Sequence, residues 1–232
     1  MDSKILIKRI GIFFIILVSL ISFLFSISTV RAASSISLGK PAKLDVRFLV
    51  DSSFSMKTAD PNNLRIRTLQ KLVKKLPNDS RSGVWTYGKY INMLVPLGTV
   101  DARWRKQAIY NLDKINGYGS YTNLSSAIES ALHGWQQKSG YQKFIVVLTN
   151  GGLKSQETKA GDSADRLKLL TRILPKLKKA NIKIHTISLA DSADHRLLKI
   201  LAEQTQGKWY TVADIKLLEG VMNHMYKQLN IS

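Results

Sequence analysis

Apolar runs that are typical of buried β-strands recur along the chain from residue 44 onward. The run at residues 44–50 is interrupted only by Asp45 and Arg47, which predicts a central strand buried on both faces. Between two of the predicted strands, Gly88-Lys89 favours a tight hairpin with the glycine at positive φ, and therefore one antiparallel edge strand. The other strands are predicted at residues 83–87, 90–95, 143–149, 182–189 and 208–212.

Helical periodicity fills most of the segments between these strands. Leu69, Leu72, Val73 and Leu76 follow the i, i+3, i+4, i+7 pattern of one helix face, and Pro77 ends that helix. Further helices are predicted at residues 102–112, 123–135, 166–179, 195–204 and 215–230, with a polar loop at 150–165. The alternation predicts an α/β fold: a doubly wound, mostly parallel sheet with one antiparallel edge strand and helices on both faces.

Two of these helices contain residues that attract other interpretations. Pro175 removes a backbone donor and is expected to kink or divide its helix. Met222 and Met225 repeat with the apolar face of the last helix, so we assign them to the core and not to a cofactor.

The first 32 residues have the pattern of a secretory signal. Three basic residues, Lys4, Lys8 and Arg9, precede an apolar run at residues 10–27. We expect cleavage after Ala32, and a retained membrane anchor is the alternative because a run of this length can span a bilayer. Either reading predicts an exported protein, periplasmic or anchored to the outer face of the inner membrane. A short linker at 33–43 and a domain at 44–230 follow.

Composition narrows the possible chemistry. The 232 residues include no cysteine, which excludes disulfides, thiolate metal sites and cysteine nucleophiles. The formal net charge is +19, and removal of the first 32 residues leaves +16. This charge favours anionic surfaces such as lipid headgroups or acidic envelope polymers. Export and the lack of a base-reading or RNA-binding motif argue against nucleic acid as a partner.

Polar residues cluster where two of the buried strands end. In open parallel α/β sheets the functional crevice lies beyond the carboxyl ends of the strands. After the first strand the chain reads Asp51-Ser-Ser53-Phe-Ser55, which places one carboxylate and two hydroxyls where they can face one centre. Oxygen ligands of this kind suit a hard cation such as Mg²⁺. Short Asp/Ser strings also occur in ordinary turns, where they bind local backbone, and that alternative stays open for this motif alone.

Two other segments add to this pattern. Thr122 precedes a predicted helix after the loop at 116–121, and its hydroxyl can either cap the helix or complete a cation shell. Asn150 follows the buried strand at 143–149.

Together, the Asp51-x-Ser53-x-Ser55 loop, the helix start at Thr122 and the strand end at Thr149-Asn150 resemble the von Willebrand factor A-type (VWA) domain. The resemblance covers about residues 44–229 and implies a metal-ion-dependent adhesion site. In such a site Mg²⁺, or alternatively Mn²⁺ or Ca²⁺, binds an acidic side chain of a protein partner. By resemblance, Asp51, Ser53, Ser55, Thr122 and Asn150 would hold the ion. We place Tyr118, Ser120 and Tyr121 at the partner surface.

One position departs from the family's pattern. Asn150 stands where the family usually has an aspartate, so the site has one carboxylate where two are expected. Weaker metal binding follows, and the ion would be more electrophilic toward a partner's carboxylate.

Enzymatic motifs are not found in the sequence. It contains no serine elbow, no HExxH and no phosphate-cradling glycine loop, and its four histidines fall on predicted helices or a strand. The tryptophans are assigned to the core or to half-buried positions, except Trp104, which lies between two arginines and is the best candidate for an exposed aromatic.

The sequence therefore predicts a non-enzymatic, exported VWA module for divalent-cation-dependent protein–protein interaction or adhesion in the cell envelope. The alternative is a structural or assembly factor with a degenerate metal site, which binds anionic polymers or lipids through its basic surface. Chelators should abolish only the first mode of binding, and salt should weaken the second.

Overall fold

A computed structural model describes residues 43–117, 119–135, 140–150, 159–189 and 195–229 of the chain. Its strands form one sheet in the order β3-β2-β1-β4-β5-β6, in which only the β2–β3 pair is antiparallel. The strand bounds are β1 Lys43–Asp51, β2 Arg81–Tyr87, β3 Ile91–Thr99, β4 Tyr141–Thr149, β5 Ile182–Leu189 and β6 Trp209–Val212. The predicted fold class is confirmed, and β1 is central between β2 and β4.

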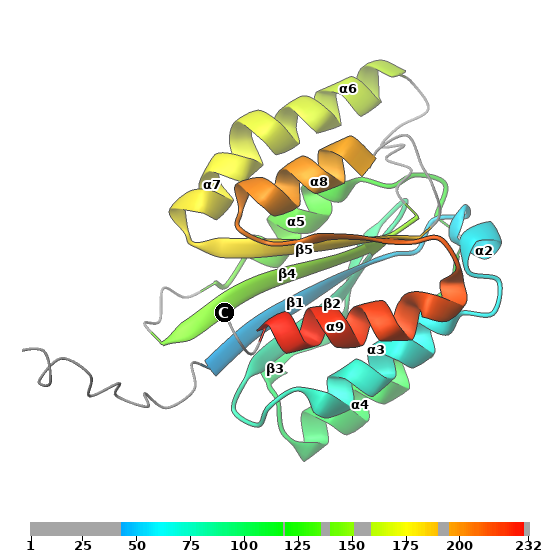
Figure 1. Cartoon of the computed structure of the whole chain (residues 1–232), viewed down its shortest axis with the longest axis vertical. Helices are drawn as coiled ribbons and strands as arrows, with labels where there is room; N and C mark the ends of the chain where they lie inside the picture. Colours follow the sequence, from blue (N-terminus) through cyan, green and yellow to red (C-terminus); the bar gives the residue numbers. More distant parts are fainter. Residues whose placement is uncertain (1–42, 118, 136–139, 151–158, 190–194, 230–232) are drawn as a thin grey trace, which may run out of the picture. The chain divides into compact units, whose positions relative to one another are not determined.

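Helices cover both faces of this sheet (Figure 1). The face with α3, α4 and α9 lies below the sheet in Figure 1, and the face with α5, α6, α7 and α8 lies above it. The helix bounds are α2 Met56–Ala59, α3 Leu64–Lys75, α4 Ala102–Leu112, α5 Leu124–Leu132, α6 Lys159–Lys168, α7 Leu174–Lys179, α8 His195–Gln204 and α9 Leu218–Leu229. A 3₁₀ turn at Ile215–Leu217 precedes α9.

Each face of the sheet has its own hydrophobic core, because successive residues of β1 point to opposite sides. Val46, Phe48 and Val50 pack with α3, α4 and α9, whereas Leu49 packs with α5, α7 and α8. Met222 and Met225 are buried in the first core, as predicted. Among the described residues, both cores are formed by side chains between residues 44 and 229.

The two charged residues of β1 share a buried ion pair. Arg47 Nε lies 3.2 Å from Asp45 Oδ1, and the Arg47 guanidinium stacks on Trp135 at 3.7 Å from the ring centroid. The same guanidinium donates to the carbonyls of Ala131 and of His133, the latter at 2.9 Å. The last carbonyls of a helix have no partner within the helix. Arg47 therefore fixes the C-terminal end of α5 to the sheet and explains why Trp135 is half-buried.

The predicted division of the helix around Pro175 is confirmed. A π-helical turn at Leu169–Ile173 separates α6 from α7, and Pro175 is the second residue of α7. Proline has no N–H to donate to the preceding turn. The wider π turn lies where the carbonyl that would have accepted this hydrogen bond is found.

The predicted start of this helix was wrong, and the predicted loop at 150–165 was wrong for residues 159–165, whereas residues 151–158 lie outside the described residues. α6 begins at Lys159 and not at 166. Its attachment to α5 is polar: Lys168 Nζ lies 2.6 Å from Glu129 Oε2, and Asp165 is buried. Residues 159–165 contain no large apolar side chain, so no apolar periodicity marks this first part of the helix in the sequence.

The expectation that Trp104 is exposed was also wrong. Trp104 is 7% exposed, and its indole Nε1 donates to the Pro96 carbonyl at 3.0 Å. Gly98 has no side chain, so the indole can lie directly on β3. β3 itself extends beyond the predicted end at residue 95 and accommodates Pro96 because it is an edge strand with a register shift beside it.

The predicted signal or anchor at 1–32 and nearly all of the linker at 33–43 lie outside the described residues. Among the residues that are described, no helix is long and apolar enough to cross a membrane.

His185 predicts a specific pH dependence of stability. Burial, followed by the charges of Lys183 and Lys208, lowers the pKa of His185 from 6.5 to about 4. Between these two values the unfolded chain binds a proton that the folded protein does not, so stability falls as the pH falls from 6.5 toward 4. Urea unfolding at pH 7.5 and pH 5.0 should show about 2 kcal/mol less acid destabilisation for His185→Gln than for the wild type. Equal pH dependence of the two proteins would contradict this assignment.

Candidate metal site at the carboxyl end of the central strands

Asp51 is the last residue of β1 and is completely buried. Its Oδ1 accepts a hydrogen bond from the Ser53 backbone N–H at 2.8 Å, and its Oδ2 accepts one from the Thr149 hydroxyl at 2.7 Å. Thr149 ends β4, the neighbour of β1. The carboxylate therefore holds the β1–α2 loop to the end of β4.

The two serine hydroxyls of this loop are directed at each other. Ser53 Oγ and Ser55 Oγ are 2.9 Å apart, with Ser53 buried and Ser55 exposed. Neighbouring ligands of an octahedral Mg²⁺ ion, bound at about 2.1 Å, are about 3.0 Å apart, so this hydrogen-bonded pair already has close to the spacing of two adjacent ligands. By contrast, the Ser52 hydroxyl points away and donates to the Tyr87 carbonyl at 3.1 Å. The loop thus presents the predicted pair of hydroxyls, and the hydroxyl of Ser52, which precedes them, points elsewhere.

A backbone bridge brings the segment before α5 against this loop. Ser53 and Gly119 form an isolated parallel bridge, in which Phe54 N donates to Gly119 O at 2.7 Å and Gly119 N donates to Ser52 O at 3.1 Å. A Cβ on Gly119 would lie 2.8 Å from Gly88 Cα, and a Cβ on Gly88 would lie 3.1 Å from Gly119 Cα. The hairpin glycine Gly88 therefore serves this close approach and not the positive φ that the sequence suggested.

Thr122 lies three residues after this bridge and is 2% exposed. Two roles were predicted for its hydroxyl: capping α5 or binding a cation. Thr122 does not cap the helix, because the N-cap is Asn123, whose Oδ1 accepts a hydrogen bond from Ser126 N at 2.9 Å. Asn150 directly follows Thr149 and is partly exposed. Asn150 is predicted to lie next to Asp51. The register supports this, because it pairs Val50 with Leu148, and Asp51 and Asn150 follow these two residues directly and two positions later.

The three residues predicted for the partner surface have different outcomes. Tyr118 lies outside the described residues. Ser120 is exposed, and Tyr121 is partly exposed.

Sequence reasoning missed Phe54, which stands between the two site serines and is 63% exposed, with Lys57 Nζ 5.0 Å from its ring centroid. A large aromatic residue inside a polar metal-site loop is the sequence signal that would have identified it.

The surroundings of the Asp51 carboxyl favour a cation. Burial raises the pKa of Asp51, and the hydrogen bonds from Ser53 and Thr149 and the positive charge of Arg65 oppose this rise only in part. Tyr87, its register partner on β2, is also fully buried, and burial together with the Asp51 charge raises the pKa of its phenol well above the usual value. A divalent cation at this site would supply the charge that stabilises a buried carboxylate.

Arg65 is itself held in a buried ion pair. Its Nη1 lies 2.8 Å from Asp60 Oδ2, and Asp60 also accepts the backbone N–H groups of Leu64 and Arg65. These contacts fix the start of α3 beneath the short helix α2, and thereby the end of the site loop.

The donor set fits a hard divalent cation. It offers one carboxylate, hydroxyls and one amide oxygen, all of which are ligands that Mg²⁺, Mn²⁺ and Ca²⁺ accept. Among the described residues, no group of three or more His, Asp and Glu side chains gathers around one point. A cation here would therefore depend mainly on hydroxyl ligands, and this favours weak binding.

A doubly wound α/β domain with hydroxyl-rich loops at the carboxyl end of its central strands is a known class of binding domain. The chain belongs to the von Willebrand factor type A domain family, whose model matches residues 45–224. Domains of this family typically bind a metal ion at such a site, mediate protein–protein interactions and are generally not enzymes. Comparison with curated protein sequences gives no match.

Solved structures support the fold. A von Willebrand factor type A protein from Catenulispora acidiphila matches with a TM-score of 0.65 and 15% identity, over 81% of this chain and 43% of that one. BatB from Bacteroides thetaiotaomicron matches with a TM-score of 0.58 and 16% identity, over 82% of this chain and 100% of that one. Manganese-loaded TRAP protein from Plasmodium vivax matches with a TM-score of 0.58 and 17% identity, over 80% and 74%. The chain thus spans less than half of the first of these proteins.

The Gly119 contact predicts a sharp difference between two glycine substitutions. In Gly119→Ala the new Cβ would lie within 2.9 Å of backbone atoms of Gly88 and Lys89, so the loop must shift. We expect a loss of about 1–3 kcal/mol in the free energy of unfolding, measured by urea denaturation.

The matched control is Gly220→Ala. A Cβ at Gly220, in α9, meets nothing within 4 Å, and it should raise the unfolding free energy by up to about 1 kcal/mol. Similar losses in the two variants would show that the contact of Gly119 with Gly88 is not the cause.

Proposed function

We propose that this chain is a non-enzymatic binding module that uses a divalent cation to recognise an acidic side chain of a protein partner. The observation that carries the proposal is the 2.9 Å separation of Ser53 Oγ and Ser55 Oγ beside the buried Asp51 carboxylate. Ser53, Ser55 and Thr122 would hold Mg²⁺, with Asp51 and Asn150 as oxygen donors directly or through water. The ion would supply the positive charge that binds the partner's carboxylate.

The surface around the site supports a protein partner. Phe54 projects from the loop between the two serines, and Ser120 lies exposed on the neighbouring segment. Exposed aromatic residues near the centre of a contact surface are common anchors of protein interfaces. With Tyr118 and Tyr121, they would surround the partner's acidic group.

The apolar run at residues 10–27 supports an exported protein that acts in the cell envelope. The periplasm, or the outer face of the inner membrane if the segment is retained as an anchor, is the compartment we propose. BatB, and an aerotolerance-related membrane protein from Bacteroides fragilis whose structure is also similar, are bacterial proteins with this fold.

Thermal unfolding of residues 33–232 with Mg²⁺, Mn²⁺ or EDTA tests the metal site. A ligand that binds the folded state at ten times its Kd stabilises it by about 1.4 kcal/mol, and this raises the Tm by about 3–6 °C for a domain of this size. We expect such a rise with millimolar Mg²⁺, its loss in Asp51→Ala and Ser53→Ala, and a larger rise in Asn150→Asp. The last result is expected because a second carboxylate strengthens cation binding.

Ser52→Ala is the matched control, since its hydroxyl points to the Tyr87 carbonyl and not to the site. This variant should keep the full metal-dependent rise in Tm. A wild-type protein whose Tm does not respond to millimolar Mg²⁺ or Mn²⁺ would refute the metal-dependent function.

A further inference from the structure

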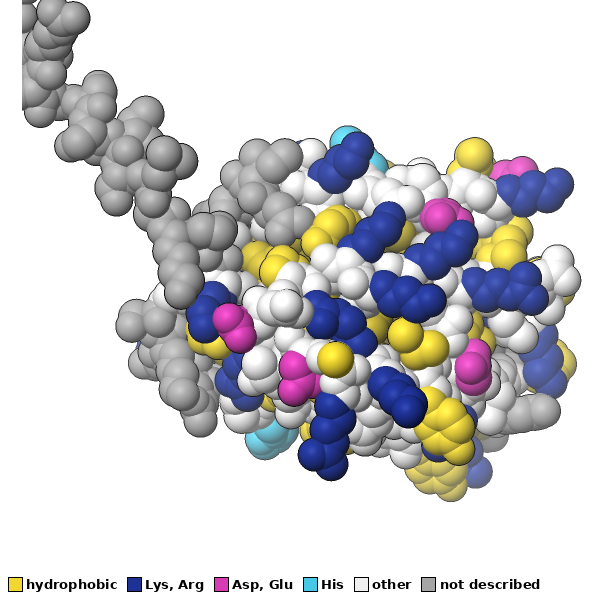
Figure 2. All heavy atoms as spheres, turned by 90° about the horizontal axis from the view of Figure 1, so that it is seen from below, with side chains coloured by type: hydrophobic (Ala, Val, Ile, Leu, Met, Phe, Trp, Pro, Cys, Tyr) yellow, Lys and Arg dark blue, Asp and Glu magenta, His cyan; other side chains and the backbone are white. Residues whose placement is uncertain are grey.

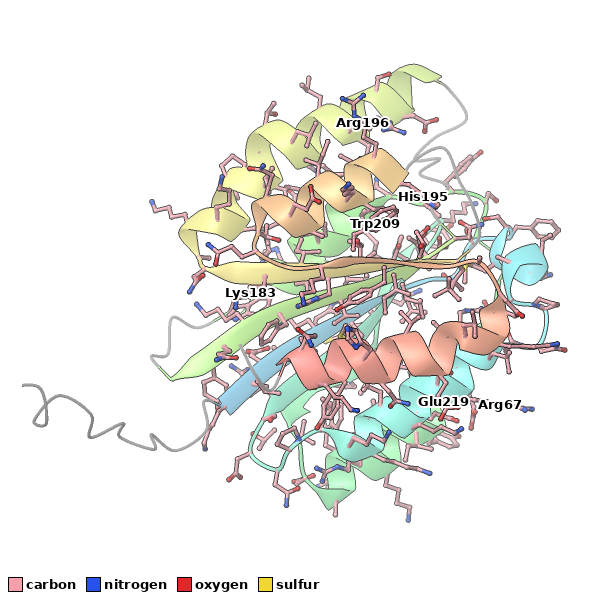
Figure 3. All side chains as sticks on the ribbon, in the orientation of Figure 1. Arg67, Lys183, His195, Arg196, Trp209 and Glu219 are labelled. Carbon is pink, nitrogen blue, oxygen red and sulfur yellow. The ribbon has the colours of Figure 1, made fainter. Side chains whose placement is uncertain are left out.

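Positive charge gathers at the end of the sheet opposite the metal site. We call this region the amino edge: the described residues where the parallel strands begin and where the helices that precede them, together with α9, end. In Figure 3, Lys183 lies on this side and His195, which follows the carboxyl end of β5, lies on the other. The basic residues of the amino edge are Lys43, Lys74, Lys75, Arg81, Lys143, Lys178, Lys179, Lys183, Lys208 and Lys227.

Few carboxylates oppose these charges. The acidic residues described at the same edge are Asp45, Asp79, Asp101 and Glu203. Asp45 is buried and is already shared by Arg47 and Arg81, at 3.2 and 3.8 Å. The amino edge therefore carries a large excess of positive charge at its surface.

Four lysines of the amino edge form hydrogen bonds with neutral oxygens. Lys75 Nζ donates to Asn223 Oδ1 at 2.7 Å, and Lys208 Nζ donates to Gln228 Oε1 at 2.7 Å. Lys143 Nζ donates to a backbone carbonyl, and Lys178 Nζ to a glutamine, both at 3.4 Å. These contacts orient the ammonium groups without neutralising them.

The helical face seen in Figure 2 provides a contrast. Lysine and arginine side chains are spread over this face too, among a few acidic ones. There, Lys71 Nζ lies 2.6 Å from Glu219 Oε2, in a pair that cancels its charge. High positive charge alone therefore does not distinguish the amino edge, whereas the small number of carboxylates beside its basic residues does.

Two further features fit an anionic ligand at the amino edge. A depression of about 320 Å³ opens between the starts of β4 and β5, and Lys143 and Lys183 are among the residues that line it. The charges of Lys183 and Lys208 also contribute, after burial, to the lowered pKa of His185 beneath them.

The position of the N-terminal segment selects among anionic partners. β1 begins at Lys43, on the amino edge itself. The apolar run that we assign to a signal or an anchor ends at residue 27. Residues 28–42, fully extended, span at most about 50 Å, so a retained anchor would keep this edge near the membrane surface.

We propose that the amino edge docks on anionic phospholipid headgroups and so directs the metal site at the opposite end of the sheet away from the membrane. Basic residues close to an anionic bilayer each add to the affinity, and the attraction falls within a Debye length. Docking at this edge needs no cation in the metal site.

Co-sedimentation of residues 33–232 with vesicles of phosphatidylcholine and phosphatidylglycerol tests this proposal. Bound protein should increase with the phosphatidylglycerol fraction, fall steeply between 50 and 300 mM NaCl, and be unaffected by EDTA or by Asp51→Ala. The combined substitution Lys75→Gln, Lys178→Gln, Lys179→Gln and Lys208→Gln changes four exposed residues of the amino edge. We expect it to lower the vesicle partition coefficient at least tenfold.

The matched control removes the same charge at the opposite end of the sheet, with Arg67→Gln, Lys89→Gln, Lys114→Gln and Lys216→Gln, which are exposed residues. This variant should lose less than threefold. Equal losses in the two variants would overturn the assignment to the amino edge, and so would binding to pure phosphatidylcholine. Binding to poly-glutamate but not to vesicles would overturn the lipid in favour of an acidic protein partner. Because the expected vesicle binding depends neither on a bound cation nor on Asp51, failure here is distinct from failure of the metal site.

Discussion

Burial of a single carboxylate, that of Asp51, organises the functional end of this domain. An ionised group removed from water is costly unless hydrogen bonds and opposite charge stabilise it. Asp51 receives one hydrogen bond from its own loop and one from the end of β4, and it feels the charge of Arg65. Each of these partners belongs to a different part of the fold, so the carboxylate can be accommodated only when the central strands and the start of α3 are in place.

The arrangement of strands and helices was largely predictable because it follows from burial. A strand that is apolar on both faces, such as β1, must lie at the centre of a sheet with helices on both sides, and the structure places it there. The loop after Asp51 was predictable for a related reason, since the order of a parallel sheet brings its carboxyl ends together. The hydroxyl pair of Ser53 and Ser55 meets as the spacing of the motif indicated.

The features that could not be predicted depend on contacts between segments far apart in the sequence. Gly88 and Gly119 are conspicuous only once their backbones are seen to touch. Trp104 was expected to be exposed because arginines flank it, and the space above Gly98 that receives it is not visible in the sequence. The first turns of α6 contain no large apolar residue, so hydrophobic periodicity does not detect them.

The clamp formed by Arg47 on α5 has a mechanical consequence. Its guanidinium binds two carbonyls at the end of the helix and stacks on Trp135, whereas Asn123 caps the other end close to Thr122. A slide of α5 along its axis would break all the contacts of Arg47 together. A tilt that pivots on Arg47 would preserve them and still displace Thr122. Movement at the candidate metal site would therefore tilt α5 about its C-terminal end, where Arg47 holds it, and would not slide the helix along its axis.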